Sequence, residues 1–141
     1  MMEFLEVPKG RRRSKRLTST WQTIDQVADG LPFTFFEELA SRLHWTETQL
    51  ATLVFIEPRT LTRRRRAGSF TRLESDRLAR VARIWDATLE FFDGDAEAAR
   101  TWLQRPRAAL RGHAPIALAA TDAGAREVER LLVQLDHGVV P

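Results

Sequence analysis

The most chemically distinctive stretch of this sequence is a run of four arginines at positions 63–66, with Arg59 and Thr60 shortly before it. An arginine guanidinium can donate two hydrogen bonds to one guanine, and a good pair of this kind discriminates against the wrong base by about 1–3 kcal/mol. Arginine also contacts the phosphates of a nucleic acid backbone. The run therefore predicts contacts with DNA. The alternative is that these side chains are solvated or paired with acidic residues of the same chain.

No arrangement of side chains in the sequence predicts catalysis or a metal site. The three histidines, His44, His113 and His137, lie far apart and have no acidic cluster at metal-site spacing around them. The chain contains no cysteine, which excludes disulfides, thiolate metal ligands and cysteine nucleophiles. None of the serines lies in the sequence context of a nucleophile elbow. We therefore expect no catalytic residue, no metal, no cofactor and no enzymatic activity.

Positive charge is concentrated near the N-terminus. The formal net charge is +3, and it becomes −3 when the six basic residues at positions 9–16 are left out. We expect residues 1–31 to form a basic, largely disordered arm, in which Trp21, Ile24 and Val27 have the spacing of a short docking helix. Such an arm can bind phosphate backbones without sequence preference, although a leader with no binding role is an equally good interpretation.

The composition, 43% hydrophobic and 29% charged residues, is typical of a soluble globular protein. No apolar run approaches the ~20 residues that a membrane-spanning helix needs. The N-terminus has no apolar core of the kind found in a secretory signal. We therefore expect no membrane segment and a cytoplasmic location.

The elements that must position the arginines are helices. A stripe of Phe36, Leu39 and Leu43 predicts the first of them, from residue 33. Thr46 followed by Gln49 has the spacing of a capping box and predicts the start of a second helix. A third helix is expected from about residue 58, where proline suits a first turn, to about residue 67, where Gly68 follows.

The second and third of these helices, joined by a tight turn, form the pattern of a helix-turn-helix in residues 46–68. The pattern resembles the Cro/Xre type, since Ala51, Ile56 and Leu61 fall where that motif packs its helices together. Phe55, however, occupies the turn position that is usually glycine. In such motifs the N-terminal part of the second helix contacts base edges. This predicts operator DNA as a partner, with side chains at the bases or phosphates from Arg59, Thr60, Arg63, Arg64, Arg65 and Arg66.

The longest predicted helix covers about residues 72–92, and Thr71 with Glu74 again has capping-box spacing. Its main apolar stripe predicts a core face. Ile84, Ala87 and Phe91 lie off that stripe and form a candidate homodimer surface. The alternative is that the rest of the domain covers both faces of the helix. We assign residues 32–92 to the helix-turn-helix and dimerisation region.

The last third of the chain, residues 93–141, reads as two helices around a connector broken by proline and glycine. Pro106 ends the first helix, and Thr121 is the expected cap of the second. The second helix has an apolar face formed by Val128, Leu131, Leu132 and Leu135, and Gly138 is placed to end it.

The order of short features in this last third, WL, RP, AL, G, P, T, GA, VE, LL and HGV, resembles the toxin-binding domain of the Xre/MbcA/ParS antitoxin family. Two positions depart from the family pattern, which usually has a small polar residue at Arg107 and glycine at Arg111. The resemblance implies an all-α fold, in which a Cro/Xre-like helix-turn-helix bundle is followed by a small helical toxin-binding domain.

The same resemblance implies a function: the antitoxin of a type II toxin–antitoxin module, which binds a cognate RES-domain toxin that consumes NAD. A higher-order complex of the two proteins would repress their shared promoter. The segment implied to cover the toxin's active site is formed by Leu135, His137, Gly138, Val139, Val140 and Pro141. The alternative function is a stand-alone helix-turn-helix regulator whose C-terminal domain only dimerises. A third hypothesis, a scaffold without DNA binding, would use the basic helix to bind an acidic partner.

Overall fold

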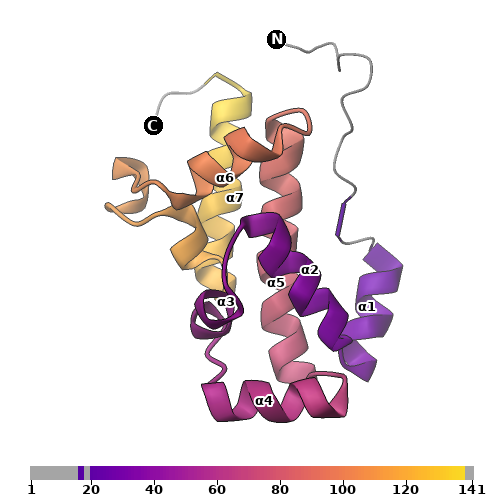
Figure 1. Ribbon diagram of the computed structural model, residues 1–141. Coiled ribbons are helices and arrows are strands. Elements are labelled where there is room, and N and C mark those ends of the chain that lie inside the picture. Colours follow the sequence, from indigo (N-terminus) through magenta and orange to yellow (C-terminus); the bar gives the residue numbers. More distant parts are fainter. Residues whose placement is uncertain (1–15, 18–19, 139–141) are drawn as a thin grey trace.

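The computed structural model of the chain describes residues 16–17 and 20–138. Within these residues the fold is all-α, as the sequence predicts, with two short 3-10 helices between the last two α-helices and no β-strand (Figure 1). None of the helices described is long and apolar enough to cross a membrane. In chain order the elements are α1 (Thr20–Asp29), α2 (Phe33–Leu43), α3 (Glu47–Leu53), α4 (Pro58–Ala67), α5 (Arg72–Phe91), α6 (Ala96–Gln104), η1 (Ala108–Leu110), η2 (Pro115–Leu118) and α7 (Asp122–Asp136).

The helix starts predicted in the N-terminal half are confirmed. The Thr46 hydroxyl accepts a hydrogen bond from the Gln49 N–H at 3.1 Å, and the Gln49 side chain accepts one from the Thr46 N–H at 2.8 Å. This reciprocal capping box begins α3. Pro58 occupies the first turn of α4, and Gly68 ends that helix with a left-handed backbone, φ 87°. The two helices of the predicted helix-turn-helix are thus α3 and α4.

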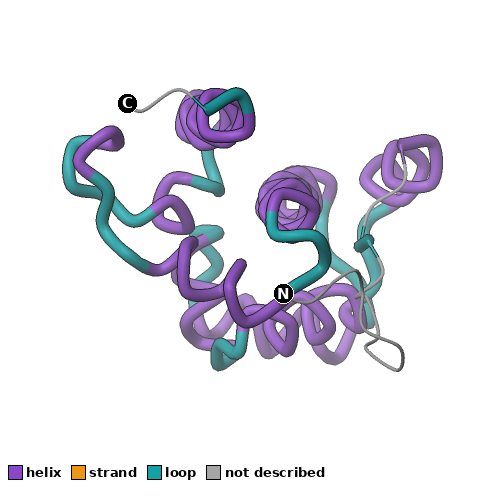
Figure 2. The backbone as a smooth tube through the Cα atoms, turned by 90° about the horizontal axis from the view of Figure 1, so that it is seen from above, coloured by secondary structure: helices purple, strands orange, loops and turns teal. Residues whose placement is uncertain are grey.

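Helix α5 is the central element of the fold. Its core stripe is fully buried at Leu78, Val81 and Trp85, and the helix is flanked by α7 on one side and α1 on the other (Figure 2). The expected off-stripe surface of α5 needs a correction, because Ile84 is fully buried within the single chain. Ala87 and Phe91 are half-buried and remain partly at the surface. For Ile84 the alternative interpretation, that the domain covers both faces, is therefore the right one.

Within the expected arm of residues 1–31, the described part contains a helix. Helix α1 packs on α5, and the Leu17 backbone N–H donates a hydrogen bond to the Asp86 carboxylate at 2.8 Å. The short docking helix suggested by the spacing of Ile24 and Val27 is thus present as α1. The basic residues at positions 9–15, and with them most of the predicted arm, lie outside the described residues.

The helices of the C-terminal half begin and end where the sequence predicts. Asp95 caps α6 by accepting a hydrogen bond from the Ala98 N–H at 3.2 Å, and α6 ends two residues before Pro106. Thr121 caps α7 through the Gly124 N–H at 3.1 Å. Gly138, with φ 76°, follows the end of α7. The ends of α7 are therefore fixed by local chemistry at both termini.

Three arginines along α5 join the two halves of the molecule. Arg77 donates to the Val54 carbonyl at the end of α3 at 3.3 Å, and Arg80 donates to the Ala120 carbonyl just before α7 at 2.9 Å. Arg83 forms an ion pair with Glu129 of α7 at 2.9 Å. Because these three side chains belong to one helix, we call them the α5 arginine ladder. The ladder fixes the C-terminal half relative to the helix-turn-helix.

Candidate functional site

Helix α4 lies at one end of the molecule (Figure 1), and its sequence contains five arginines. Leu61 is the buried anchor of the helix. At 100° per residue, Arg59, Arg63 and Arg66 all fall on the side opposite Leu61, and all three are exposed. None of the three forms an ion pair within the described part of the chain. These arginines form the basic face of α4, which has the residue types and exposure that a DNA contact requires.

Arg64, predicted to contact bases, is instead paired within the chain. Its Nε and Nη2 donate to the two carboxylate oxygens of Glu74 at 2.7 and 2.9 Å, and the two side chains are 22% and 11% exposed. Glu74 also accepts a hydrogen bond from the Thr71 N–H, as the capping box of α5. Arg64 therefore attaches α4 to the first turn of α5, and its Nε and Nη2 donors are engaged within the chain.

Arg65 is also engaged within the chain. It forms an ion pair with Glu47 at the start of α3, and its guanidinium lies over the Phe33 ring, 4.7 Å from the ring centroid. The hydrogen bond that Arg65 donates to the Glu47 carboxylate raises the pKa of the Arg65 side chain. For Arg64 and Arg65 the alternative of acid pairing thus describes the structure. Thr60 is half-buried, and its hydroxyl accepts a hydrogen bond from Arg63 at 3.3 Å.

The turn before α4 accommodates Phe55 in a left-handed backbone conformation, with φ 63°. This conformation costs an L-residue roughly 1–2 kcal/mol, which explains why glycine is usual there. The ring is 65% exposed, and the Arg77 guanidinium lies 5.6 Å from its centroid. The predicted mismatch is therefore tolerated because the side chain projects outward without entering the core.

The segment implied to cover a toxin's active site is only partly described. Leu135 is half-buried against the core, while His137 and Gly138 are exposed at the end of α7. Val139, Val140 and Pro141 lie outside the described residues. The end of α7 lies at the opposite end of the molecule from α4 (Figure 1). The two candidate interfaces are therefore well separated.

Next to the end of α7 is a surface groove of about 570 Å³ that the sequence did not predict. Its floor is apolar, and Val133 in it is 55% exposed. His137 lies at its edge. We call it the acidic groove because its lining includes the four carboxylates Glu90, Asp93, Glu129 and Asp136. The sequence offered one signal for this groove: Glu129 and Asp136 are seven residues apart on α7, a spacing that places both carboxylates on the same face of the helix.

The described residues hold no group of three or more histidine, aspartate or glutamate side chains that could bind a metal ion. The histidines are spread over the fold: His44 at the end of α2, His113 in the connector and His137 at the end of α7.

Two family models match this chain, and together they cover most of it. The model described as the antitoxin Xre/MbcA/ParS C-terminal toxin-binding domain matches residues 87–138. The model described as the antitoxin Xre-like helix-turn-helix domain matches residues 22–83. The first match contains the acidic groove and the end of α7, and the second contains the basic face of α4.

Three curated relatives, all named antitoxin Xre, are similar over most of their length. The Yersinia enterocolitica protein is 36% identical over 118 residues, which is 80% of this chain and 80% of the relative. The Photorhabdus laumondii protein is 31% identical over 79% of this chain and 76% of the relative. The Pseudomonas putida protein is 32% identical over 98% of this chain and 81% of the relative. With an identity above 30% over at least three-quarters of both sequences in each case, and with both domains matched in order, this chain belongs to the Xre antitoxin family.

Proposed function

We propose that this protein is the antitoxin of a type II toxin–antitoxin module and neutralises a RES-domain toxin that degrades NAD. The observation that carries the proposal is the match of residues 87–138 to a toxin-binding domain. In this proposal the C-terminal segment, from Leu135 through residues 139–141, covers the toxin's active site. The antitoxin itself needs no catalytic group for this role.

The structure of α7 suits such a role physically. The helix is capped at Thr121, packed on α5 along its length, and ends at the exposed residues His137 and Gly138. Binding loses free energy when a mobile segment must be ordered, so a segment that begins on a rigid helix binds at lower cost. The apolar residues that follow Gly138 in the sequence are of the kind that a concave, mostly apolar pocket accepts.

We further propose that the protein contacts operator DNA through the basic face of α4, Arg59, Arg63 and Arg66, with Thr60 beside it. The exposure of these three arginines on one side of the second helix of a helix-turn-helix supports this proposal. The toxin complex would then repress the promoter of both genes in the cytoplasm. A homodimer would present two such helices to two half-sites. Because Ile84 is buried within the single chain, the proposed homodimer contact on α5 consists of Ala87 and Phe91.

The test compares the full-length chain with a chain ending at His137, using the product of the neighbouring toxin gene. Pull-down measures binding, growth and cellular NAD measure neutralisation, and thermal denaturation confirms that the shortened chain still folds. We expect the full-length chain to bind and rescue, and the shortened chain to fold and bind promoter DNA without rescuing growth.

Rescue by the shortened chain would contradict the proposal that the C-terminal segment covers the active site. Failure of the full-length chain to bind the toxin, together with a shift of its own promoter DNA, would favour the stand-alone regulator.

A further inference from the structure

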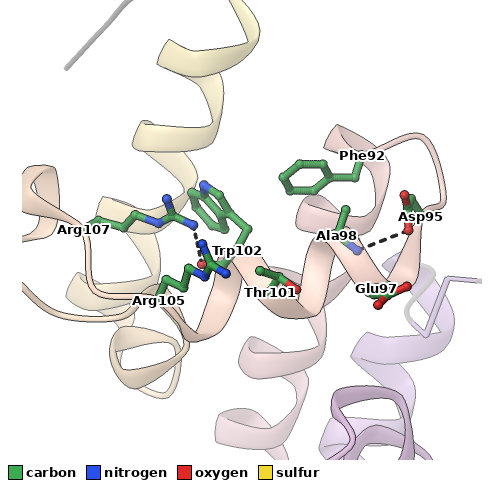
Figure 3. A pocket seen from close by; sticks show the side chains of 8 residues that line it. All are labelled: Phe92, Asp95, Glu97, Ala98, Thr101, Trp102, Arg105 and Arg107. Atoms are coloured by element: carbon green, nitrogen blue, oxygen red, sulfur yellow. Dashed lines mark hydrogen bonds between the residues drawn. The ribbon is translucent and has the colours of Figure 1, made fainter. Parts of the chain in front are cut away.

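A second concavity lies at the C-terminal end of α5, along one side of α6, and has a volume of about 430 Å³ (Figure 3). We call it the α6 pocket. Its apolar lining includes Phe92, Ala98 and Trp102. Two arginines, Arg105 and Arg107, lie at one end, while carboxylates lie at the other (Figure 3). Exposed residues form its rim, so it is open enough to admit a side chain from another protein.

The arginine end of the pocket has no acidic partner among residues 16–17 and 20–138. The Arg107 guanidinium lies over the Trp102 ring, 5.1 Å from its centroid, and its Nη2 donates to the Trp102 carbonyl at 3.0 Å. Its Nε is buried and has no hydrogen-bond partner among the described residues. Burial lowers the pKa of this guanidinium, and the like charge of Arg105 lowers it further. Neither arginine forms an ion pair in the described part of the chain.

The carboxylates at the opposite end of the pocket are used differently. Asp95 accepts the hydrogen bond that caps α6, from the Ala98 N–H. Glu97 lies in the first turn of α6, where a negative charge is favoured by the helix dipole. Both are therefore stabilised where they are, and Arg105 and Arg107 keep a positive charge that no acidic residue in the described part of the chain neutralises.

We propose that Arg105 and Arg107 bind an aspartate or glutamate side chain of the toxin, whose aliphatic part lies on Trp102. Two guanidinium groups offer the several N–H donors that a carboxylate accepts, and such charge-assisted hydrogen bonds are roughly twice as strong as neutral ones. The inference rests on the proposed function, because it takes the toxin as the partner. It adds the chemistry of one contact, which the C-terminal segment does not provide.

The position of the pocket supports a toxin as its occupant. It lies within residues 87–138, which match the toxin-binding domain. Phe92 lines the α6 pocket and Phe91 lines the acidic groove, and the two rings meet edge to face at 4.9 Å. The two concavities therefore flank the same end of α5, and the groove is bordered by His137 at the end of α7. A toxin bound at that end of α5 would reach the arginine end of the α6 pocket.

The experiment measures the dissociation constant of full-length variants with the toxin encoded by the neighbouring gene, at several salt concentrations. The Arg105 side chain is exposed and forms no hydrogen bond or ion pair with the described residues, so Arg105→Gln leaves the fold intact. We expect this change to weaken binding at least tenfold, about 1.4 kcal/mol, and to reduce the salt dependence of binding. Arg105→Glu should weaken it further. Neutralising the toxin carboxylate that binds there should weaken the binding of wild type more than that of Arg105→Gln, which keeps only Arg107 to bind it.

The matched control is Arg111→Gln, which removes the same charge from the same connector but outside the pocket. It should bind within twofold of wild type. If Arg105→Gln and Arg105→Glu bind as well as this control, with unchanged salt dependence, the inference is wrong while the proposed function stands. If the wild-type chain does not bind the toxin at all, both are wrong.

Discussion

Replacing Arg64 by glutamine tests whether this arginine belongs to the fold and not to the DNA interface. Arg64 makes two hydrogen bonds with the Glu74 carboxylate, at 2.7 and 2.9 Å. Hydrogen bonds to charged groups contribute roughly 1.5–3 kcal/mol, whereas exposed ion pairs contribute about 0–1 kcal/mol. With the two side chains 22% and 11% exposed, the pair falls between these cases. We expect Arg64→Gln to lower the free energy of unfolding by about 2 kcal/mol, and the midpoint temperature by roughly 6 °C.

The pH dependence of stability gives a second readout of the same contact. Burial alone would raise the pKa of Glu74, but the hydrogen bonds from Arg64 and Thr71 outweigh it and hold the pKa below 4.5. Because the folded-state pKa is the lower one, the carboxylate stabilises the fold above pH 4.5, and this contribution is lost as the pH falls through the folded-state value. In Arg64→Gln the stability should therefore fall less steeply below pH 4.5 than in wild type.

The assay is urea denaturation followed by circular dichroism, at pH 7 and in steps below pH 4.5. Arg63→Gln is the control, because it makes the same change at the next position of the same helix, where the side chain contacts only Thr60 in the described structure. The control should change stability by less than about 0.5 kcal/mol. The role assigned to Arg64 would be refuted if the two variants lost the same free energy of unfolding at pH 7. It would also be refuted if the stability of Arg64→Gln fell as steeply with acid as that of wild type.

Three further predictions follow from single positions. Arg63→Gln should weaken binding to promoter DNA by about 1–3 kcal/mol in a titration, and undiminished binding would remove it from the proposed DNA contact. Gly124→Ala should destabilise the fold by about 1–3 kcal/mol despite alanine's better helix propensity, because the added Cβ would lie 2.2 Å from the Leu118 carbonyl oxygen; a higher midpoint temperature would contradict this. Arg111→Gly should stabilise the fold by about 0.5–1 kcal/mol, because Arg111 has φ 57° and is exposed; denaturation that shows a loss would disprove the strain at that position.

The features that the sequence predicted correctly are those decided by neighbours in the chain. Thr46, Thr71 and Thr121 each cap the following helix by accepting a hydrogen bond from the N–H three residues further along the chain. Capping depends on a side chain and an N–H a few positions apart, so spacing is enough to find it. The apolar stripes of the helices are local signals of the same kind, and the resemblance to the antitoxin family implied the all-α fold class.

The features that sequence reasoning missed depend on partners far along the chain. Ile84 lies off the main stripe of α5, and only the packing of the other helices decides that it is buried. Arg64 lies in a basic run that resembles a DNA contact, and its pairing depends on Glu74 serving as both capping residue and ion partner. A helical face can be computed from spacing, but the face of a neighbouring helix that meets it cannot.

The candidate interfaces were partly predictable for the same reason. The arginines of α4 were found from the helix-turn-helix pattern. That pattern did not predict that two of them, Arg64 and Arg65, pair with acidic residues of the same chain. The acidic groove and the α6 pocket each combine residues from two helices separated by a connector, so neither forms a local motif. The α5 arginine ladder did have a local signal, because Arg77, Arg80 and Arg83 recur at every third position of the longest helix.

The α5 arginine ladder also limits how such proteins can recombine. The match to the helix-turn-helix model ends at residue 83, and the match to the toxin-binding model begins at residue 87. The boundary between the domains therefore falls inside α5. A chimaera joined there would take Arg80 and Arg83 from one parent and their acceptors Ala120 and Glu129 from the other, whereas Arg77 would keep its acceptor Val54. The backbone carbonyl at position 120 is present whatever the residue there, whereas the ion pair of Arg83 requires an acidic side chain at position 129. Exchanging toxin specificity between relatives should therefore succeed when α5 is transferred together with the C-terminal half. The two domains share α5 and do not behave as independently interchangeable modules.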